Sequence, residues 1–257
     1  MGSVQLLDRT RRIGKLLRDK DDGRVRFEDI CRLLCESTGA NCLLLSKKGK
    51  VLGSANTPEV KVIDELLTDE IGEYIDKSLN ERMIEILSTK ENVNIRTLGF
   101  EETDAKAYHL LVIPIFMSGD RFGTLLIYRC SEEFDIDDII LCEYSTSIIG
   151  LEMLRSVAEE IDREKRRVQS AQSAMASLSA AEVDALVEIF KELHNLEGVL
   201  VASKIADRMG ITRSVIVNAM RKLESAGVIE AKSSGMKGTY IKILNDCIFD
   251  ELKKVRQ

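Results

Sequence analysis

The stretch ASKIADRMGITRSVIVNAMR, from Ala202 to Arg221, decides the fold of the C-terminal part of this 257-residue chain. It predicts a short helix over Ser203–Met209 that ends at Gly210, because glycine adopts left-handed backbone geometry at low steric cost. A second helix is expected to have Thr212 as its N-cap and to end near Ser225. Two short helices joined by a tight turn that contains glycine form a helix-turn-helix motif.

The second helix of this motif has two chemically different faces. Ile216, Met220 and Leu223 repeat at helical spacing and form the stripe that should face the core. The other side carries guanidinium, amide, hydroxyl and small apolar groups, on Arg213, Ser214, Val217, Asn218 and Arg221. Arginine pairs with guanine edges, asparagine with adenine, and an aliphatic group with the thymine methyl. This face is therefore predicted to read bases in a DNA major groove, although on a plain surface helix the same side chains would simply face water.

A β-hairpin, or wing, is expected directly after the second helix. Residues 228–232 and 239–244 favour strands, and a turn with two glycines joins them. Lysines on this hairpin suit phosphate contacts, which position a domain without reading sequence, although a solvated hairpin edge would carry them equally well. The expected DNA-contact set is Ser203, Lys204, Thr212, Arg213, Ser214, Asn218, Arg221 and Lys237.

Charge is distributed unevenly along the chain. Residues 203–257 contain eleven Lys and Arg against six Asp and Glu, a net charge of +5. The whole chain has a net charge of −6, so residues 1–202 carry −11. A basic end on an acidic body concentrates the attraction for nucleic acid at that end, so the acidic total is no argument against DNA binding.

Composition and cysteine usage limit the remaining classes. A hydrophobic content of 44% with 31% charged residues is typical of globular domains, and the length suits two of them. No apolar run approaches the roughly 18 residues of a membrane span, and the first residues lack an apolar signal-peptide core, so we expect a cytoplasmic protein. The six cysteines are expected to be reduced and mostly buried, and the Cys31–Cys35 spacing with two histidines in the chain predicts no metal site.

The N-terminal part predicts an α+β domain with an antiparallel sheet. Helices are expected over residues 6–17 and 27–35, hairpins over 42–53 and 108–129, two or three helices between 59 and 88, and a long helix over 137–177. The second hairpin resembles those of GAF and PAS sensor domains. The SAAE sequence at 179–182 predicts a capping box that opens the first helix of the DNA-binding domain. The expected domains are therefore a sensor over 1–155, a helical connector over 156–177 and a winged helix-turn-helix domain over 178–257.

Motifs for catalysis are missing from the sensor part. There is no GxSxG elbow, no GxxxxGK[ST] loop and no Cys/His pair at a useful spacing, so no catalytic residue is predicted. The lysines of SKKGK could meet a phosphate, although a solvated hairpin tip explains them as well. Asp137 and Asp138 at a helix start are explained by the helix dipole. Tyr74, Phe100, Tyr108 and Phe116 are expected in the core.

Two segments, VASKIADRMGITRSVIVNAMRKLESAGVIE and GMKGTYIKIL, together with SKKGKVLG and GDRFGTLLI, resemble the CodY family of nutrient-sensing transcriptional repressors of Gram-positive bacteria. The resemblance is strongest from residue 178 to 244 and weakest from 57 to 106. It implies a homodimer of GAF-like sensor and winged helix-turn-helix domains that binds an AT-rich inverted-repeat operator. It further implies activation by GTP and branched-chain amino acids, isoleucine foremost, and repression of genes for amino-acid biosynthesis, transport and starvation responses.

The resemblance also implies effector residues. The GTP contacts would fall on Phe27, Ser46, Lys48, Lys50 and Glu152. The amino-acid pocket would include Leu43, Ser46, Tyr74 and Thr97.

Two positions depart from the family pattern. A family lysine is Val157 here, and the arginine that holds the amino-acid carboxylate has no clear match, with Lys61 as a possible substitute. Either the chain senses a different metabolite or it responds mainly through the nucleotide. A GTP hydrolase would need a phosphate cradle and a metal carboxylate, and a pure interaction scaffold would leave the Arg213, Asn218 and Arg221 face unexplained.

Overall fold

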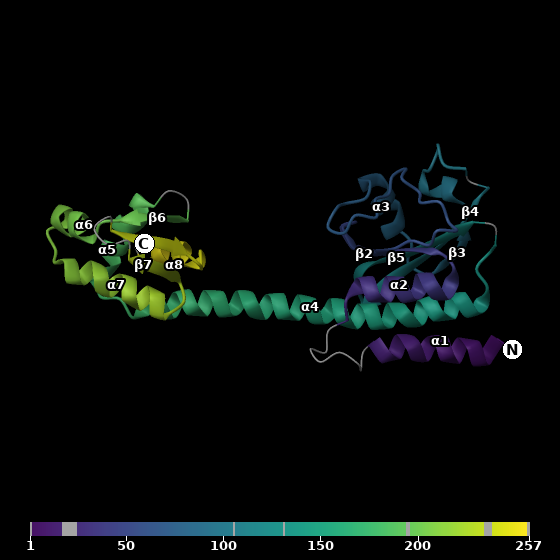
Figure 1. The fold of residues 1–257 in the computed structure, drawn as a ribbon, viewed down its shortest axis with the longest axis horizontal. Coiled ribbons are helices and arrows are strands. Elements are labelled where there is room, and N and C mark those ends of the chain that lie inside the picture. The colour runs from purple at the N-terminus through teal and green to yellow at the C-terminus, as the bar shows by residue number, and fades with distance from the viewer. Residues whose placement is uncertain are drawn as a thin grey trace. The chain divides into compact units, whose positions relative to one another are not determined.

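The computed structural model describes residues 2–16, 25–104, 106–130, 132–193, 196–233 and 238–255. The chain divides into two compact units, Met1–Val157 and Ala158–Gln257 (Figure 1). The long helix α4 (Ile136–Ala176) contributes residues to both units. None of the described helices is long and apolar enough to cross a membrane.

The N-terminal unit is built on a five-stranded antiparallel sheet with the strand order β2-β1-β5-β4-β3. The strands are β1 (Asn41–Ser46), β2 (Val51–Ala55), β3 (Lys90–Val93), β4 (Tyr108–Met117) and β5 (Asp120–Cys130). The two predicted hairpins are therefore present, and the apolar strands β1, β4 and β5 occupy the sheet centre. Strand β3 was not predicted, because its sequence KENV is short and mostly polar.

Helix α2 (Phe27–Thr38) and the first part of α4 cover one face of this sheet, and α1 (Gly2–Leu16) packs on these helices on their side away from the sheet (Figure 1). Side chains from alternate strand positions meet these helices, as expected for a pleated sheet. The shared core includes Ile30, Leu34, Leu44, Leu111, Ile127 and Ile149. Helix α2 runs one turn further than predicted and ends at Gly39, whose φ of 61° is left-handed.

The opposite face packs against α3 (Lys77–Ile84), the 3-10 helix η1 (Ile95–Leu98) and the segment 56–76 (Figure 1). The core on this side includes Leu43, Leu45, Leu79, Met83, Leu110, Val112 and Leu126. The prediction of two or three helices between 59 and 88 is wrong, since α3 is the only helix described there.

Polar anchors explain why the segment 56–76 is ordered without being helical. The amide Nδ2 of the buried Asn41 donates to the carbonyl of Val60 at 3.3 Å. The Tyr108 hydroxyl donates to the carbonyl of Lys61 at 3.2 Å, and Tyr128 Oη accepts from Ile63 N at 3.5 Å. Such bonds satisfy backbone groups that a helix would otherwise pair internally.

Two of the aromatic residues expected in the core lie at the surface. Phe100 and Tyr108 are buried as predicted, with 1% and 7% of their surface exposed. Tyr74 is 58% exposed and Phe116 is 39% exposed, so the expectation for these two is wrong. Phe116 instead stacks under the guanidinium of Arg121, at 5.5 Å from the ring centroid.

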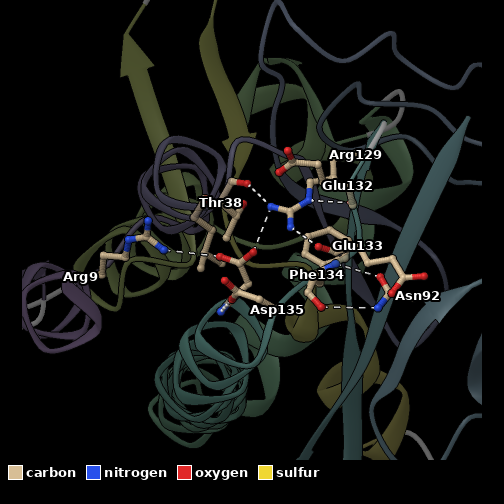
Figure 2. A network of polar contacts seen from close by, with 10 residues as sticks. Arg9, Thr38, Asn92, Arg129, Glu132, Glu133, Phe134 and Asp135 are labelled. Atoms are coloured by element: carbon tan, nitrogen blue, oxygen red, sulfur yellow. Dashed lines mark hydrogen bonds and ion pairs between the residues drawn. The ribbon is translucent and has the colours of Figure 1, made fainter. Parts of the chain in front are cut away.

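Arg129, near the end of β5, joins three segments of the N-terminal unit (Figure 2). Its guanidinium donates to the carbonyls of Thr38 at 2.7 Å, Glu132 at 3.1 Å and Glu133 at 2.6 Å. It also lies over the ring of Phe134, at 4.4 Å from the centroid. The end of α2, the end of β5 and the loop before α4 are thus held by one planar donor group.

Asp138, in the first turn of α4, supplies the counter-charge. Its carboxylate is 3.0 Å from Arg129 and 3.4 Å from Arg9 of α1, and its side chain is 7% exposed. Burial raises the pKa of Asp138, while the Arg129 charge beside it lowers it. The helix dipole alone, as inferred from the sequence, therefore does not account for this residue.

The C-terminal unit combines helices with a three-stranded antiparallel sheet in the order β6-β8-β7. Its elements after α4 are α5 (Ala180–Glu192), β6 (Glu197–Leu200), α6 (Ala202–Met209), α7 (Arg213–Ser225), β7 (Ile229–Ser233), β8 (Thr239–Ile243) and α8 (Cys247–Val255). The predicted wing is the β7–β8 pair, and β6 adds a strand that the sequence did not reveal.

The end of α4 belongs to the core of the C-terminal unit. Ala171, Ala174 and Met175 are buried there with the apolar residues of α5, α6 and α7. The predicted capping box is present after it: Ser179 N donates to Glu182 Oε2 at 2.7 Å, and Glu182 N donates to Ser179 Oγ at 3.4 Å. The last turns of α4, from Glu164 to Met175, thus pack as part of this unit.

Replacing Asp138 with Ala should destabilise the N-terminal unit by about 3–5 kcal/mol, because Arg129 would keep a buried charge without its partner. Four of the five tyrosines, residues 74, 108, 128 and 144, lie in this unit, so near-UV circular dichroism during urea unfolding reports on it. The control is Asp8→Ala, which removes an exposed pair with Arg12 at 3.2 Å and should cost less than about 1 kcal/mol. Equal losses in both variants would contradict this role of Asp138.

Candidate nucleic-acid interface and effector sites

Helices α6 and α7 form the predicted helix-turn-helix pair. Gly210 ends α6 with a φ of 67°, which is the left-handed geometry expected of a glycine at this turn. On α7, Ile216 and Leu223 are fully buried and Met220 is 7% exposed, so the predicted inward stripe is confirmed. Burial of one apolar stripe fixes the rotation of the helix about its axis.

The N-cap residue of α7 is Thr212, as predicted, but it makes no capping hydrogen bond. Thr212 occupies the N-cap position with φ −80° and ψ 147°, but its side chain accepts no hydrogen bond from the helix backbone. Its hydroxyl lies 2.7 Å from Ser214 Oγ instead. Two hydroxyl groups are thereby placed together at the exposed start of α7.

The outward face of α7 is exposed and chemically unsatisfied. Arg213, Ser214, Asn218 and Arg221 are all exposed. Within the described part of the chain, Arg213, Asn218 and Arg221 form no ion pair and no side-chain hydrogen bond. Two guanidinium groups and an amide are thus available to an outside partner, and they match the donor and acceptor pattern of base edges.

Lys222 on the same helix has a different role, which sequence reasoning missed. Its ammonium group donates to Glu182 Oε2 at 2.7 Å and to the carbonyl of Ser177 at 2.8 Å. The hydrogen bond from Lys222 lowers the pKa of the Glu182 carboxyl. Lys222 therefore attaches α7 to the start of α5. Only this contact, between segments that are distant in sequence, distinguishes the role of Lys222 from that of the exposed Arg221.

The remaining expected DNA contacts lie on α6 and the wing. Ser203 and Lys204 are exposed in the first turn of α6. On the wing, Lys242 is exposed and Lys232 pairs with Glu230 at 2.8 Å. Lys237 lies outside the described residues.

Three of the expected GTP contacts border one end of the sheet face that α2 and α4 cover. Ser46 of β1 pairs with Gly123 of β5, and a Cβ on Gly123 would stand 3.3 Å from Met153 Cε on α4. Glu152, next to Met153, is 9% exposed. A Cβ on Gly53, in β2, would stand 3.1 Å from Phe27 Cβ at the start of α2.

The other two expected GTP contacts lie on the β1–β2 turn. Lys48 is exposed and Lys50 is half-buried. The hydroxyl of Ser46 accepts a hydrogen bond from Lys50 N at 3.0 Å, which closes the turn. A negatively charged group at this turn would meet two lysines held beside the end of β1.

The residues expected to bind an amino acid do not share one face of the sheet. Leu43 is 1% exposed in the core beneath α3, whereas Ser46 lies on the α2–α4 face by strand alternation. Tyr74 is exposed and pairs with Lys50 through an isolated β-bridge. Thr97, in η1, is exposed and donates to the carbonyl of Asn94 at 2.7 Å.

Two grooves lie on the α3 side of the N-terminal unit. One, of about 640 Å³, is lined by Thr97 together with Arg82 and Leu98. The other, of about 710 Å³, lies between residues 61–65 and 102–108 and includes Lys61. Lys61, the possible substitute for the family arginine, therefore does line a cavity of the sensor unit.

The remaining chemically reactive side chains are the cysteines and the potential metal ligands. The six cysteines are free; Cys31, Cys35, Cys42 and Cys142 are buried and the other two are half-buried. Burial raises the pKa of Cys142, which disfavours the reactive thiolate. In the described ranges, no group of three His, Cys, Asp or Glu side chains is placed to hold a metal ion.

Comparison with known proteins gives matches for both parts of the chain. The family model for the CodY GAF-like domain matches residues 5–177, and the model for the CodY helix-turn-helix domain matches residues 196–256. A protein of Anoxybacillus flavithermus named global transcriptional regulator CodY is 44% identical over 260 residues, covering 98% of this chain and 99% of that protein. A protein of the same name from Clostridium kluyveri is 46% identical over 261 residues, with the same coverage of each chain.

Solved structures give a further similarity. The cofactor-binding GAF domain of the nutrient sensor CodY from Clostridium difficile is 29% identical, with a TM-score of 0.42 over 57% of this chain and 96% of that chain. The two family models and the near full-length relatives show the family without this structural similarity. The chain belongs to the CodY family of global transcriptional regulators, with a GAF-like sensor domain and a helix-turn-helix DNA-binding domain.

Proposed function

We propose that α7 is the recognition helix of a ligand-gated repressor, and that Arg213, Ser214, Asn218 and Arg221 read the bases of its operator. The supporting observation is that Arg213, Asn218 and Arg221 are exposed without an intramolecular partner among the described residues, on a helix whose opposite face is buried. Exposed arginines on a structural helix more often pair with neighbouring carboxylates, as Arg208 on α6 does with Glu192. Ser203, Lys204, Thr212 and Lys237 would contact the phosphates beside them.

We further propose that GTP binds at the β1–β2 turn, through Lys48, Lys50 and Ser46, with Phe27 and Glu152 alongside. Two lysines beside a backbone turn suit the charge of a triphosphate. Glu152 lies on α4, whose last turns pack in the C-terminal unit. The residues 156–177 between them would carry the signal as a helical connector, because a helix transmits geometry better than a flexible linker.

A branched-chain amino acid, with isoleucine first, is proposed as the second effector. The alternative is a different metabolite, or GTP alone. One observation favours the alternative: Leu43, Ser46, Tyr74 and Thr97 do not share one face of the sheet. Lys61 in its groove offers a charge for a carboxylate. The regulated genes would be those of amino-acid biosynthesis, transport and starvation responses.

A hydrolase is the competing function from another class. GTP hydrolysis needs a metal-bound phosphate cradle, and the Lys48–Lys50 turn is a hairpin without the phosphate loop that hydrolases use. Steady-state GTP turnover by the full-length chain would favour the hydrolase over the regulator.

A homodimer is proposed from the exposed surface of α4. Ile140, Tyr144, Leu151 and Leu154 are 39–53% exposed and follow the 3–4 spacing of a coiled-coil seam. Large apolar side chains in such a stripe favour a second helix as partner. Two helix-turn-helix units would then bind an AT-rich inverted repeat, one half-site each.

Arg213→Glu should abolish specific operator binding and leave the fold intact. Loss of one good base contact costs about 1–3 kcal/mol, and the new carboxylate also repels phosphate. Operator affinity is measured by fluorescence anisotropy at fixed salt, with the melting temperature as the check on folding. Lys253→Glu makes the same charge change on α8 and should weaken binding far less. Unchanged affinity in Arg213→Glu would rule out α7 as the recognition helix.

GTP should tighten operator binding by about five- to 150-fold, the usual range of an allosteric coupling. The double variant Lys48→Ala/Lys50→Ala should lose most of that gain while its affinity without GTP stays the same, because a ligand shifts a population only through differential affinity. Lys77→Ala/Lys90→Ala removes two lysines of the same unit and should keep the gain. A full GTP effect in the first double variant would place the nucleotide elsewhere.

Leu151→Glu/Leu154→Glu should convert the dimer to a monomer at micromolar concentration, since four carboxylates would face one another across the seam. Sedimentation equilibrium measures the mass, and footprinting should show protection of half-sites only at much higher protein concentration. Ser156→Glu adds one charge outside the seam as a control. A dimer that survives the double substitution would show that another surface holds it.

A further inference from the structure

The β1–β2 turn, which carries Lys48 and Lys50, is attached to α3 by one side chain. Asn80 of α3 donates from Nδ2 to the carbonyl of Lys47 at 3.3 Å. On the other side of the same residue, Lys47 N donates to the carbonyl of Phe122 in β5 at 2.8 Å. The two peptide groups that flank Lys47 are therefore held by different elements, one by the sheet and one by α3.

The Asn80 amide makes this donation while its own oxygen stays unpaired. Among the described residues, Asn80 Oδ1 is buried without a hydrogen-bond partner. It lies beside Gly49, whose φ of 80° is left-handed, and a Cβ built on Gly49 would stand 3.2 Å from this oxygen. Rotating the amide by half a turn would bring Oδ1 against the Lys47 carbonyl, where two acceptors repel each other. Buried polar groups are nearly always paired, so the unpaired oxygen indicates that the contact with Lys47 fixes this side chain.

Helix α3 is fixed at both ends, so it holds Asn80 in one place. At its start, the Asp76 side chain caps the helix. At its end, the buried guanidinium of Arg121 in β5 donates to the carbonyl of Ile84 at 3.2 Å. Arg121 directly precedes Phe122, so α3 and the β1–β2 turn are fastened to adjacent residues of one strand.

The Asn80 hydrogen bond determines the direction of a backbone donor in the turn. No described peptide bond is cis, and in a trans peptide the carbonyl and the N–H point to opposite sides. Because the Lys47 carbonyl points at Asn80, the N–H of Lys48 points away from α3. Within the described ranges, this N–H has no hydrogen-bond partner. A free backbone donor is thus aimed toward the side of the turn on which α2 and α4 lie.

We propose that Asn80 is a positioning residue of this turn, which holds the Lys47–Lys48 peptide so that Lys48 N–H donates to a phosphate group of the bound nucleotide. The inference rests on the GTP site proposed above and adds one backbone donor to its two ammonium groups. A lysine side chain is flexible and does not by itself fix the position of a phosphate. A backbone amide whose carbonyl is held on the opposite side has one direction. Asn80 lies on the α3 side and does not touch the nucleotide.

The test compares the full-length wild type with Asn80→Leu, which keeps the approximate side-chain size and removes the amide. The matched control is Asn56→Leu, the same substitution at an exposed asparagine of the sensor unit that donates to Asp69 at 2.6 Å. Calorimetry at fixed salt gives the Kd of GTP, and the melting temperature checks folding. The Lys48 amide is followed by NMR in protein labelled with ¹⁵N-lysine while GTP is added.

Asn80→Leu should weaken GTP binding by about tenfold, as expected when a hydrogen bond to a charged group is lost. Asn56→Leu should bind GTP like the wild type. In the wild type and the control, GTP should move the Lys48 amide proton downfield, because the proton then faces a phosphate oxygen. In Asn80→Leu this shift should be lost, which a decrease in stability alone would not produce.

The outcomes separate this proposal from the GTP site on which it rests. A Kd or a Lys48 amide shift that stays at the wild-type value in folded Asn80→Leu would overturn the role of Asn80 and leave the GTP site standing. An equal loss in Asn56→Leu would overturn it as well. If the wild type does not bind GTP, or if Lys48→Ala/Lys50→Ala binds it equally tightly, both proposals are wrong. If Asn80→Leu does not fold, Asn80→Ala, which adds no bulk beside Gly49, decides by the same measurements.

Discussion

Burial of the apolar stripe on α7 is the constraint on which the DNA-binding unit depends. Ile216, Met220 and Leu223 can reach the core in only one rotation of the helix, and that rotation leaves Arg213 and Arg221 outside. The Lys222–Glu182 contact then fixes the far end of the helix against α5. A packing requirement and one hydrogen-bonded ion pair thereby determine which side chains of α7 are exposed.

The sensor unit is organised around the two faces of its sheet, and the β1–β2 turn touches both. Ser46 faces α2 and α4, whereas the backbone after the turn pairs with the segment on the α3 side: Val51 N donates to Glu73 O at 2.8 Å, and Ile75 N to Gly49 O at 3.0 Å. A group that moves the turn must therefore disturb the bridge to Tyr74 as well. Two ligands on opposite faces would share this backbone even though they never touch.

Sequence periodicity predicted the elements whose stability is local, and it failed where tertiary contacts decide. The helix-turn-helix, its wing and the Ser179–Glu182 capping box follow from caps, glycines and apolar spacing, and all three are present. Strand β3, with the sequence KENV, forms because β4 offers it a free edge, which no local signal encodes. The segment 56–76 is held by side chains such as Asn41, which is distant in sequence. For the same reason the exposure of the α7 face was predictable, whereas the contacts of Lys222 and Asn80 were not.

The departures from the family pattern acquire a physical meaning in this structure. Val157, at a position where the sequence resemblance implies a lysine, is 48% exposed and lies next to the apolar residues Leu151 and Leu154 of α4. An aliphatic group there widens a surface suited to helix packing and removes a charge that a phosphate would use. On the α3 side, the arginine that the resemblance implies has no clear match, and Lys61 lies in a groove where Glu65 accepts hydrogen bonds from the amides of residues 101–103. The first position carries no charge and is exposed, and at the second the amides of residues 101–103 are paired with the protein's own carboxylate. We expect a sensor altered in this way to be harder to activate by the same ligand. Sequence identity over the full length therefore identifies the family, but it does not identify the effector.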